Sequence, residues 1–327
     1  MSRVKITGAI LVVIIPTAIF LFFGPARSIE ITNKKSGASI SDNLPKSGLS
    51  GLACEKIDRR PIAVMLSSDP EARPLAGLSQ ADMVFEMPVT PGGITRMMAV
   101  YQCELPDELG SIRSARLDFI PLAQGLDAIY AHWGGEREAL TQLDSGAIDN
   151  IDGLKYENKY YYRKNSRPRP HNGFTSNKLI EKAISDFDYD FSANPATSYG
   201  HEQESKSTGT IEPPRLYGGN YEVYWEYDSL KNEYLRFRGG REEMDANIKS
   251  QISSQNIVLI KTTWSPIDED YIRVNTVGSG QAVIYKNGTV AQGVWDKETA
   301  ESKLVFKDLN GKEIEFAPGP IWVEIVI

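Results

Sequence analysis

Residues Pro61-Ile-Ala-Val-Met-Leu66 form a short, continuous apolar run, which is typical of a strand buried on both faces. Similar runs follow at residues 83–87, 94–103 and 128–132, and turn residues or segments with helical spacing separate them. Strands that alternate with helices indicate an α/β layer. We therefore predict an α/β domain with a mixed sheet over residues 59–191.

Three helical segments are expected within this domain. Residues 116–127 carry apolar side chains at helical spacing, but Pro121 limits this segment to two short pieces. Residues 136–143 form the second helix, and residues 177–184 form the last one, with Ser176 or Asn177 as its N-cap.

The last part of the chain, residues 216–327, is predicted to be a mostly antiparallel β domain. Residues 221–227 alternate with period two, and residues 234–238 follow as a hairpin partner. Asn-Gly pairs at 287–288 and 310–311 predict two-residue hairpin turns, because both central positions of such a turn need a positive φ. The remaining expectations are a short helix at 245–252, strands at 256–261, 271–277, 281–286 and 290–295, and a closing strand pair at 313–316 and 321–327.

The N-terminal segment, residues 1–27, determines the predicted compartment. Residues 6–24 are almost entirely apolar and long enough to cross a bilayer as a helix, and Arg3 and Lys5 before them place the N-terminus in the cytoplasm. A cleaved signal peptide is the alternative. In either case the bulk of the chain is exported, behind a linker at residues 28–58. A second linker is expected at residues 192–215.

Composition narrows the classes of function. The 327 residues carry a formal net charge of −7, which argues against nonspecific nucleic-acid binding. Cys54 and Cys103 are the two cysteines, and they either pair outside the cytoplasm or remain two unrelated thiols. The three histidines lie far apart without metal-ligand spacing, and no nucleotide-binding loop is recognisable, so we predict neither a metal site nor a cofactor.

Several short motifs occur in order along the chain. They are Pro61-Ile-Ala-Val-Met65, Leu78-Ser-Gln-Ala-Asp82, Gly92-Gly-Ile-Thr-Arg96, Gly110-Ser-Ile-Arg-Ser-Ala-Arg116, Ala128-Ile-Tyr-Ala-His-Trp-Gly-Gly135 and Pro170-His-Asn172, followed by Gly293-Val-Trp295 and Pro318-Gly-Pro-Ile-Trp322 in the second domain. Together they resemble the bacterial YerB-like family of exported lipoproteins and membrane-anchored proteins. The resemblance covers roughly residues 58–327 and implies the two-part architecture and export. It carries no settled activity. The chain departs from the family in having no lipid-attachment cysteine near its apolar run.

Arginines gather in two stretches of the first domain. Guanidinium groups bind carboxylate and phosphate groups through paired hydrogen bonds, so arginines that converge predict an anion site. The alternative is an internal salt-bridge network with Glu86, Glu104, Asp107 and Glu108. The candidate ligand-binding residues are Arg96, Arg113, Arg116, Arg163, Arg167 and Asn172.

Glu86, His132 and His171 are the candidate catalytic residues. His132 ends a predicted strand, and His171 lies in a proline-flanked loop. Histidine titrates near neutral pH, so the three side chains would form a general acid/base set if they met. For each histidine the alternative is a structural, hydrogen-bonded role.

Two functional hypotheses follow. In the first, the protein is a membrane-anchored extracytoplasmic protein that binds an anionic cell-wall polymer, or a membrane-bound wall-synthesis enzyme, through an arginine-rich pocket. In the second, it is a cell-wall hydrolase or transferase that uses the acid/base set. The chain's contact with the membrane is through its N-terminal helix in both.

Overall fold

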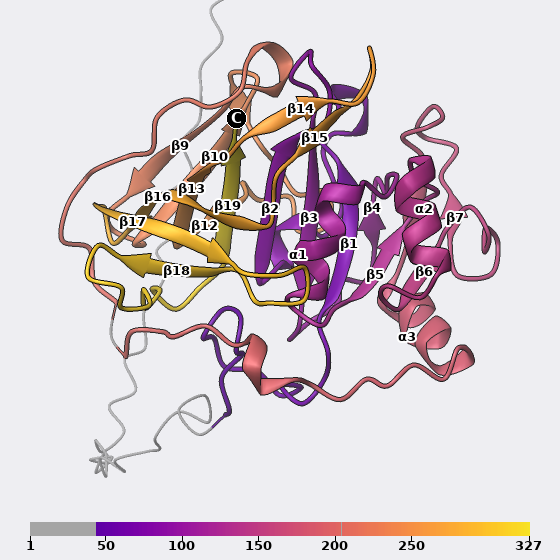
Figure 1. Cartoon of the computed structure of the whole chain (residues 1–327), viewed down its shortest axis with the longest axis horizontal. Coiled ribbons are helices and arrows are strands. Elements are labelled where there is room, and N and C mark those ends of the chain that lie inside the picture. Colours follow the sequence, from indigo (N-terminus) through magenta and orange to yellow (C-terminus); the bar gives the residue numbers. More distant parts are fainter. Residues whose placement is uncertain (1–43, 204) are drawn as a thin grey trace, which may run out of the picture. The chain divides into compact units, whose positions relative to one another are not determined.

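A ten-stranded mixed sheet is the centre of the computed structural model, which describes residues 44–203 and 205–327 (Figure 1). Across the sheet the strands follow the order β18 (Val305–Asp308), β17 (Thr289–Lys297), β16 (Gly278–Lys286), β13 (Asn256–Lys261), β19 (Ile321–Val326), β2 (Met83–Pro88), β3 (Thr95–Tyr101), β1 (Ile62–Ser67), β5 (Ile129–His132) and β6 (Asn150–Asp152). Strands from both halves of the chain therefore share one sheet.

The two halves of this sheet meet where β19 pairs with β2. Both β13 and β2 run parallel to β19, with Val323 opposite Phe85 at the β2 side. The prediction that β19 closes an antiparallel unit with residues 313–316 is therefore wrong. Residues 313–316 contribute only isolated bridges, Lys307 with Glu313 and His201 with Phe316. The observed fold is a mixed sheet with additional antiparallel β regions and few helices.

Side chains alternate between two apolar layers on opposite faces of the sheet. On β1, Ala63 and Met65 belong to one layer, whereas Ile62, Val64 and Leu66 belong to the other. Burial on both faces explains why these strands read as continuous apolar runs rather than alternating ones.

Short helices cover both layers, and they lie close to the positions predicted from the sequence. A 3₁₀ turn at Leu117–Phe119 and α1 (Ile120–Gln124) are the two pieces expected around Pro121. They lie on the first layer with α2 (Arg137–Asp144), while α3 (Asn177–Asp186) packs on the second. Ser176 is the N-cap of α3, because its side chain accepts a hydrogen bond from the Leu179 N–H.

Three smaller sheets complete the fold. They are β4 (Leu109–Gly110), β8 (Gly173–Thr175) and β7 (Tyr162–Arg163); then β9 (Val223–Asp228), β10 (Glu233–Arg238), β11 (Arg241–Glu242) and β12 (Ser253–Ser254); and the pair β14 (Trp264–Pro266) and β15 (Ile272–Val274). The β9–β10 hairpin is the one that the alternating sequence predicts. Short 3₁₀ turns lie at Pro70–Ala72, Leu78–Gln80, Pro195–Thr197 and Gly219–Tyr221.

Three local predictions have different outcomes. Asn287 and Gly288 have φ values of 55° and 68° and join β16 to β17 as a two-residue turn, as expected. At Asn310-Gly311 the turn is longer, because Asp308 accepts the Gly311 N–H and pairs with Lys312. Residues 245–252 do not form a helix. The Asp245 carboxylate instead accepts the N–H groups of Asn247 and Ser79, which stabilises a turn.

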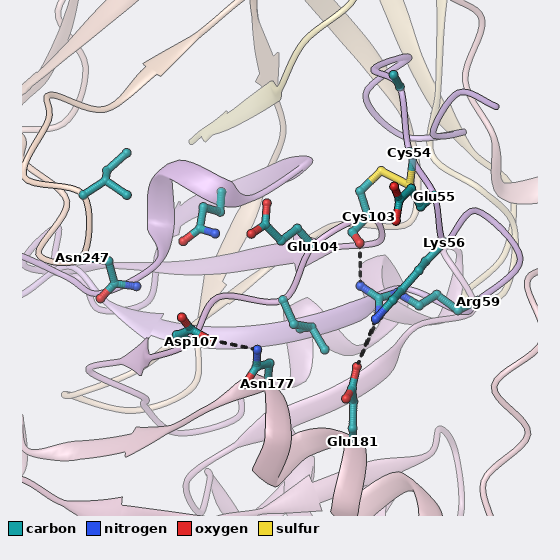
Figure 2. Close-up of a pocket in the computed structure, with 14 residues that line it drawn as sticks. Cys54, Glu55, Lys56, Arg59, Cys103, Glu104, Asp107, Asn177, Glu181 and Asn247 are labelled. Atoms are coloured by element: carbon teal, nitrogen blue, oxygen red, sulfur yellow. Dashed lines mark hydrogen bonds and ion pairs between the residues drawn. A yellow bond between two sulfur atoms is a disulfide. The ribbon is translucent and has the colours of Figure 1, made fainter. Parts of the chain in front are cut away.

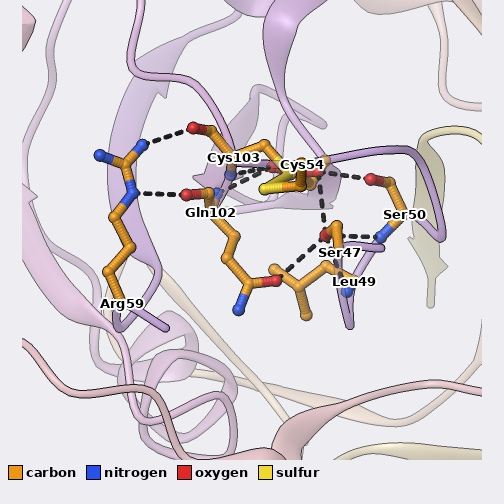
Figure 3. The surroundings of a disulfide bond; sticks show 8 residues. Ser47, Leu49, Ser50, Cys54, Arg59, Gln102 and Cys103 are labelled. Carbon is orange, nitrogen blue, oxygen red and sulfur yellow. Dashed lines mark hydrogen bonds between the residues drawn. A yellow bond between two sulfur atoms is a disulfide. The ribbon is translucent and has the colours of Figure 1, made fainter. Parts of the chain in front are cut away.

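Part of the predicted first linker is packed against the sheet. Cys54 forms a disulfide with Cys103, just after the end of β3 (Figure 3). Ser47 donates to Gln102, and Ser50 donates to Asp82. Residues 47–54 are therefore a folded segment and not a tether, since the disulfide holds it together with the buried side chains of Asp82, just before β2, and Gln102, just after β3. The predicted membrane helix at residues 1–27 lies outside the described residues. Among those that are described, no helix is long and apolar enough to span a bilayer.

Candidate functional site

Three of the six predicted ligand-binding residues meet at one end of the N-terminal strands. Arg96 lies at the start of β3, opposite Ser67 of β1. Arg113 and Arg116 lie in the loop after β4, where the Arg113 N–H donates to Met65 and the Ala115 N–H donates to Gly134. This loop thereby runs along the C-terminal ends of β1 and β5, an edge at which sheets commonly present functional groups.

Asp69 is the carboxylate that Arg96 and Arg113 share. Its Oδ2 lies 3.2 Å from Arg96 Nη1, 3.6 Å from Arg113 Nη2 and 3.8 Å from His171 Nδ1. The Ser67 hydroxyl also donates to Oδ2, at 2.7 Å. We call Asp69, Arg96, Arg113, Arg116 and His171 the basic cluster.

The arginines of the basic cluster have few hydrogen bonds to the protein. A guanidinium carries five N–H donors. Among the described residues, Arg96 donates only to the Thr95 carbonyl and Arg116 only to the Ala115 carbonyl, whereas the Arg113 guanidinium makes no hydrogen bond. The Arg113 side chain is nevertheless only 16% exposed. Buried donors without acceptors are costly, so this arrangement suits an added anion.

Electrostatics indicates an excess of positive charge at the basic cluster. The pKa of Arg96 is lowered to about 10, chiefly by burial, with smaller lowering effects of Arg113 and Arg116 and an opposing effect of Asp69. Burial would raise the pKa of Asp69, but Arg96 and Ser67 outweigh it and hold this pKa below its usual value. Burial and then Arg113 lower the pKa of His171, which is therefore neutral at pH 7. Counted over the basic cluster alone, three guanidinium groups and one carboxylate leave a net charge of about +2, while the carboxylates of Glu136 and Asp118 lie close to the backbone or charge of Arg116.

The C-terminal half of the chain contributes two tyrosines to this site. The Tyr221 hydroxyl donates to Asp69 Oδ1 at 2.8 Å. The Tyr271 ring lies 5.0 Å from the Arg116 guanidinium, within cation–π range. Sequence reasoning missed Asp69, Tyr221 and Tyr271. The pair Asp69-Pro70 reads only as a loop signal, and neither tyrosine has a motif around it.

Arg163, Arg167 and Asn172 have other partners. Arg163 donates to Glu157 and to the Asn172 side chain, and its guanidinium lies 4.3 Å from the Trp133 ring. Arg167 donates to the backbone carbonyls of Ala72 and Pro74. Within the described residues, neither arginine makes an ion pair with the basic cluster.

The three candidate catalytic residues lie in three different environments. Glu86 is fully buried and accepts hydrogen bonds from Thr95, Arg236 and Arg238. His132 is also fully buried, with its ring nitrogens 2.8 Å from the Gly134 carbonyl and 3.2 Å from Asn150 Oδ1. Strands β2 and β5 are separated by β3 and β1, so the backbones of Glu86 and His132 are about 14 Å apart. The described contacts do not join these three residues into an acid/base set.

A pocket of about 590 Å³ lies beside the disulfide, away from the basic cluster (Figure 2). Cys103 follows the end of β3 and Arg96 lies at its start, which places them about 20 Å apart. Polar groups in this pocket pair with one another. Arg59 donates to the Cys103 carbonyl and lies 3.5 Å from Glu181, and Asn177 donates to Asp107. Among the described residues, no group of His, Cys, Asp and Glu side chains is arranged to hold a metal ion.

Comparisons with known proteins agree with this architecture. Residues 47–190 match the family described as "Protein of unknown function (DUF3048) N-terminal domain", and residues 214–323 match the corresponding C-terminal domain. A Bacillus subtilis protein named "Putative lipoprotein YerB" is 32% identical over 288 residues, which are 86% of each chain. The crystal structure of Bacillus subtilis YerB superposes with a TM-score of 0.76 at 30% identity, covering 86% of this chain and 96% of that one. The chain therefore belongs to the YerB-like family, with both the N-terminal and the C-terminal DUF3048 domains.

Proposed function

We propose that this protein is exported, is held at the membrane by its N-terminal segment, and binds an anionic cell-wall polymer through the basic cluster. The apolar run at residues 6–24 and the lipoprotein name of the Bacillus subtilis relative support export and anchoring. The Cys54–Cys103 disulfide is in keeping with an oxidising compartment.

The environment of the Arg113 guanidinium is the main observation that supports the proposed anion binding. It is largely buried, makes no hydrogen bond within the described chain, and has the guanidinium groups of Arg116 and Arg96 as neighbours. Arg96, Arg113 and Asp69 alone would be a modest ion-pair network. Arg116 adds a charge that Asp69 does not contact, and this surplus is best satisfied by a phosphate or carboxylate from outside.

Binding to purified cell walls tests the proposal. The full chain in mild detergent is sedimented with wall sacculi that retain their phosphodiester polymers, and with sacculi stripped of them. Arg113→Gln is expected to weaken binding by about 10- to 100-fold, as for the loss of a charge-assisted hydrogen bond of about 1.5–3 kcal/mol. Binding should also weaken with added salt.

Arg137→Gln is the matched control, because Arg137 is exposed on α2 and makes no ion pair within the described residues. Equal binding by wild type and Arg113→Gln would refute the anion site. Binding that survives removal of the phosphodiester polymers would point instead to the carboxylates of the peptide stems. A wall hydrolase or transferase is not proposed, since no contact among the described residues joins Glu86, His132 and His171.

A further inference from the structure

A pocket of about 510 Å³ is formed by the loop after β1 together with the turn that joins β10 to β11. Its volume is within the range of about 300–1,000 Å³ that is typical of small-molecule sites. Its apolar walls are Pro70, Pro74, Leu75 and Met244. Two arginines, Arg73 and Arg238, also line it, one from each half of the chain. The pocket therefore combines apolar surface with guanidinium groups.

Arg238 brings a buried donor without a partner to this pocket. Its side chain belongs to the last residue of β10 and is almost completely buried, with the residue only 2% exposed. Its Nε donates to Glu243 and its Nη2 donates to Glu86. Nη1 is buried and makes no hydrogen bond within the described residues. Because the other two nitrogens are occupied by carboxylates, Nη1 is the nitrogen that remains for a ligand in the pocket.

Arg73 presents a second free nitrogen in a similar way. Its Nε and Nη2 both donate to the Ser68 carbonyl, and Nη2 also donates to the Asn220 carbonyl at 2.7 Å. Among the described residues these are its only hydrogen bonds, so Nη1 has none. A Cβ built on Gly239 would lie 3.5 Å from this Nη1, which places it directly beside another residue of the pocket wall. Arg73 is half-buried and lies close enough to Arg238 for the second charge to lower its pKa, after the larger effect of burial.

The charges around the pocket favour a ligand with a single negative charge. The buried and half-buried groups are the guanidinium groups of Arg73, Arg236 and Arg238 and the carboxylates of Glu86, Glu243 and Glu324. Three positive and three negative charges are balanced, so a multiply charged anion would add a large excess of negative charge at a poorly hydrated place. One carboxylate adds a single charge, and its two oxygens provide one acceptor for each free Nη1.

We propose that this pocket binds a small monocarboxylate with an apolar body. One carboxylate oxygen accepts from Arg73 Nη1, the other accepts from Arg238 Nη1, and the apolar body packs on Leu75 and Met244. The pocket shares no lining residue with the basic cluster, so this inference does not depend on the proposed anion site there.

Calorimetry with four small probes tests the inference on the full chain in mild detergent. The probes are benzoate, acetate, benzamide and inorganic phosphate. Benzoate is expected to bind about tenfold more tightly than acetate, because its ring covers apolar surface in the pocket. Benzamide has nearly the same shape without the charge, and it should bind at least about tenfold more weakly than benzoate, because its hydrogen bonds are not charge-assisted.

Two variants change the pocket in different ways. Arg73→Gln should weaken benzoate binding by at least about tenfold, through the loss of one charge-assisted hydrogen bond. Arg73 also holds two backbone carbonyls, so a second variant leaves it in place. Met244→Glu brings a carboxylate of the chain itself into the pocket, and it should weaken benzoate binding by a similar factor. Circular dichroism of each variant verifies folding.

Arg137→Gln is the matched control, because it removes one exposed arginine on α2 and should bind benzoate as the wild type does. Absence of benzoate binding, benzamide that binds as tightly as benzoate, or benzoate binding that is unchanged in both pocket variants overturns the inference. Phosphate that binds more tightly than benzoate overturns the assignment to a monocarboxylate. Benzoate binding that is lost in Arg113→Gln and kept in both pocket variants places the ligand at the basic cluster and also overturns the inference. In each case the binding of wall polymers through Arg113 is measured separately, so the proposed function stands or fails on its own.

Discussion

Replacing Arg236 with Met tests whether the two halves of the chain fold as one cooperative unit. Arg236 lies on β10, is fully buried, and donates to Glu86, to Glu243 at 2.7 Å and to Glu324 at 2.6 Å. Glu86 and Glu324 lie opposite each other on β2 and β19, where the two halves of the sheet meet. The guanidinium therefore neutralises carboxylates from both halves.

The expected loss of stability follows from the charges that remain. Met keeps the apolar bulk but leaves three buried carboxylates facing Arg238, with Arg73 as the next positive charge. Removing one partner of a buried ion pair costs about 3–5 kcal/mol. Since the free energy of unfolding of a domain is typically about 5–15 kcal/mol, the variant should remain folded, but with a much smaller free energy of unfolding.

Urea unfolding followed by tryptophan fluorescence and by circular dichroism provides the measurement. Both probes are expected to report one transition. The free energy of unfolding should fall by about 3–5 kcal/mol in Arg236→Met and by less than about 0.5 kcal/mol in the control Arg241→Met, since Arg241 is exposed on β11. Adding Glu86→Gln to Arg236→Met should restore part of the loss. A shift below about 1 kcal/mol, or two separate transitions, would refute the coupling of the two halves.

Three further predictions concern pH and redox state. Burial and then Arg113 lower the pKa of His171 below 6.5, so its imidazole gains a positive charge beside Arg113 only as the pH falls through that lowered pKa; sulfate should therefore bind more tightly on acidification by calorimetry, and His171→Ala should show no such pH dependence. Burial raises the pKa of Asp118 from 3.8 to about 7, so its contribution to stability is fully present below pH 4 and is lost as the pH rises to 7. The free energy of unfolding of Asp118→Asn, relative to that of the wild type, should therefore increase by about 2–3 kcal/mol from pH 5 to pH 7 in thermal unfolding. A difference that does not change with pH would contradict the assignment. The Cys54–Cys103 disulfide closes a 49-residue separation, so the double serine variant should lose about 2–4 kcal/mol in urea unfolding, and reducing agent should then have no further effect.

The strands of the first half could be predicted because each is an apolar run with turn residues at its ends. Residues 62–67 and 83–88 are buried on both faces, so burial alone determines their pattern. The pairing of β19 with β2 could not be predicted in this way. Residues 321–326 are equally apolar, and nothing in a single strand specifies which neighbour it takes or in which direction.

In the candidate site, too, some features could be predicted from local sequence and others depend on the tertiary structure. Arg96, Arg113 and Arg116 could be predicted because glycines and arginines are close together in the sequence there. Arg163 and Arg167 were equally good candidates from the sequence. In the structure their guanidinium groups already donate hydrogen bonds, Arg163 to Glu157 and Arg167 to the Ala72 carbonyl. The local sequence shows where an arginine is. Whether its guanidinium N–H groups remain without hydrogen bonds depends on which acceptors the tertiary structure places beside them.

Glu86 illustrates why the site depends on both halves. A carboxylate next to a predicted arginine site suggests catalysis, yet Glu86 is held by Arg236 and Arg238 from β10. Thr95 then links Glu86 to Ser68, the residue before Asp69, because its hydroxyl lies 2.5 Å from Glu86 Oε1 and 2.8 Å from Ser68 Oγ, and the Ser68 hydroxyl donates to the Thr95 carbonyl. Tyr221, close to β9 in the chain, donates to Asp69 from the other side. The ion pairs that join the halves therefore also position the carboxylate around which the arginines gather, so that loss of the C-terminal half should abolish anion binding even though every arginine of the basic cluster lies in the N-terminal half.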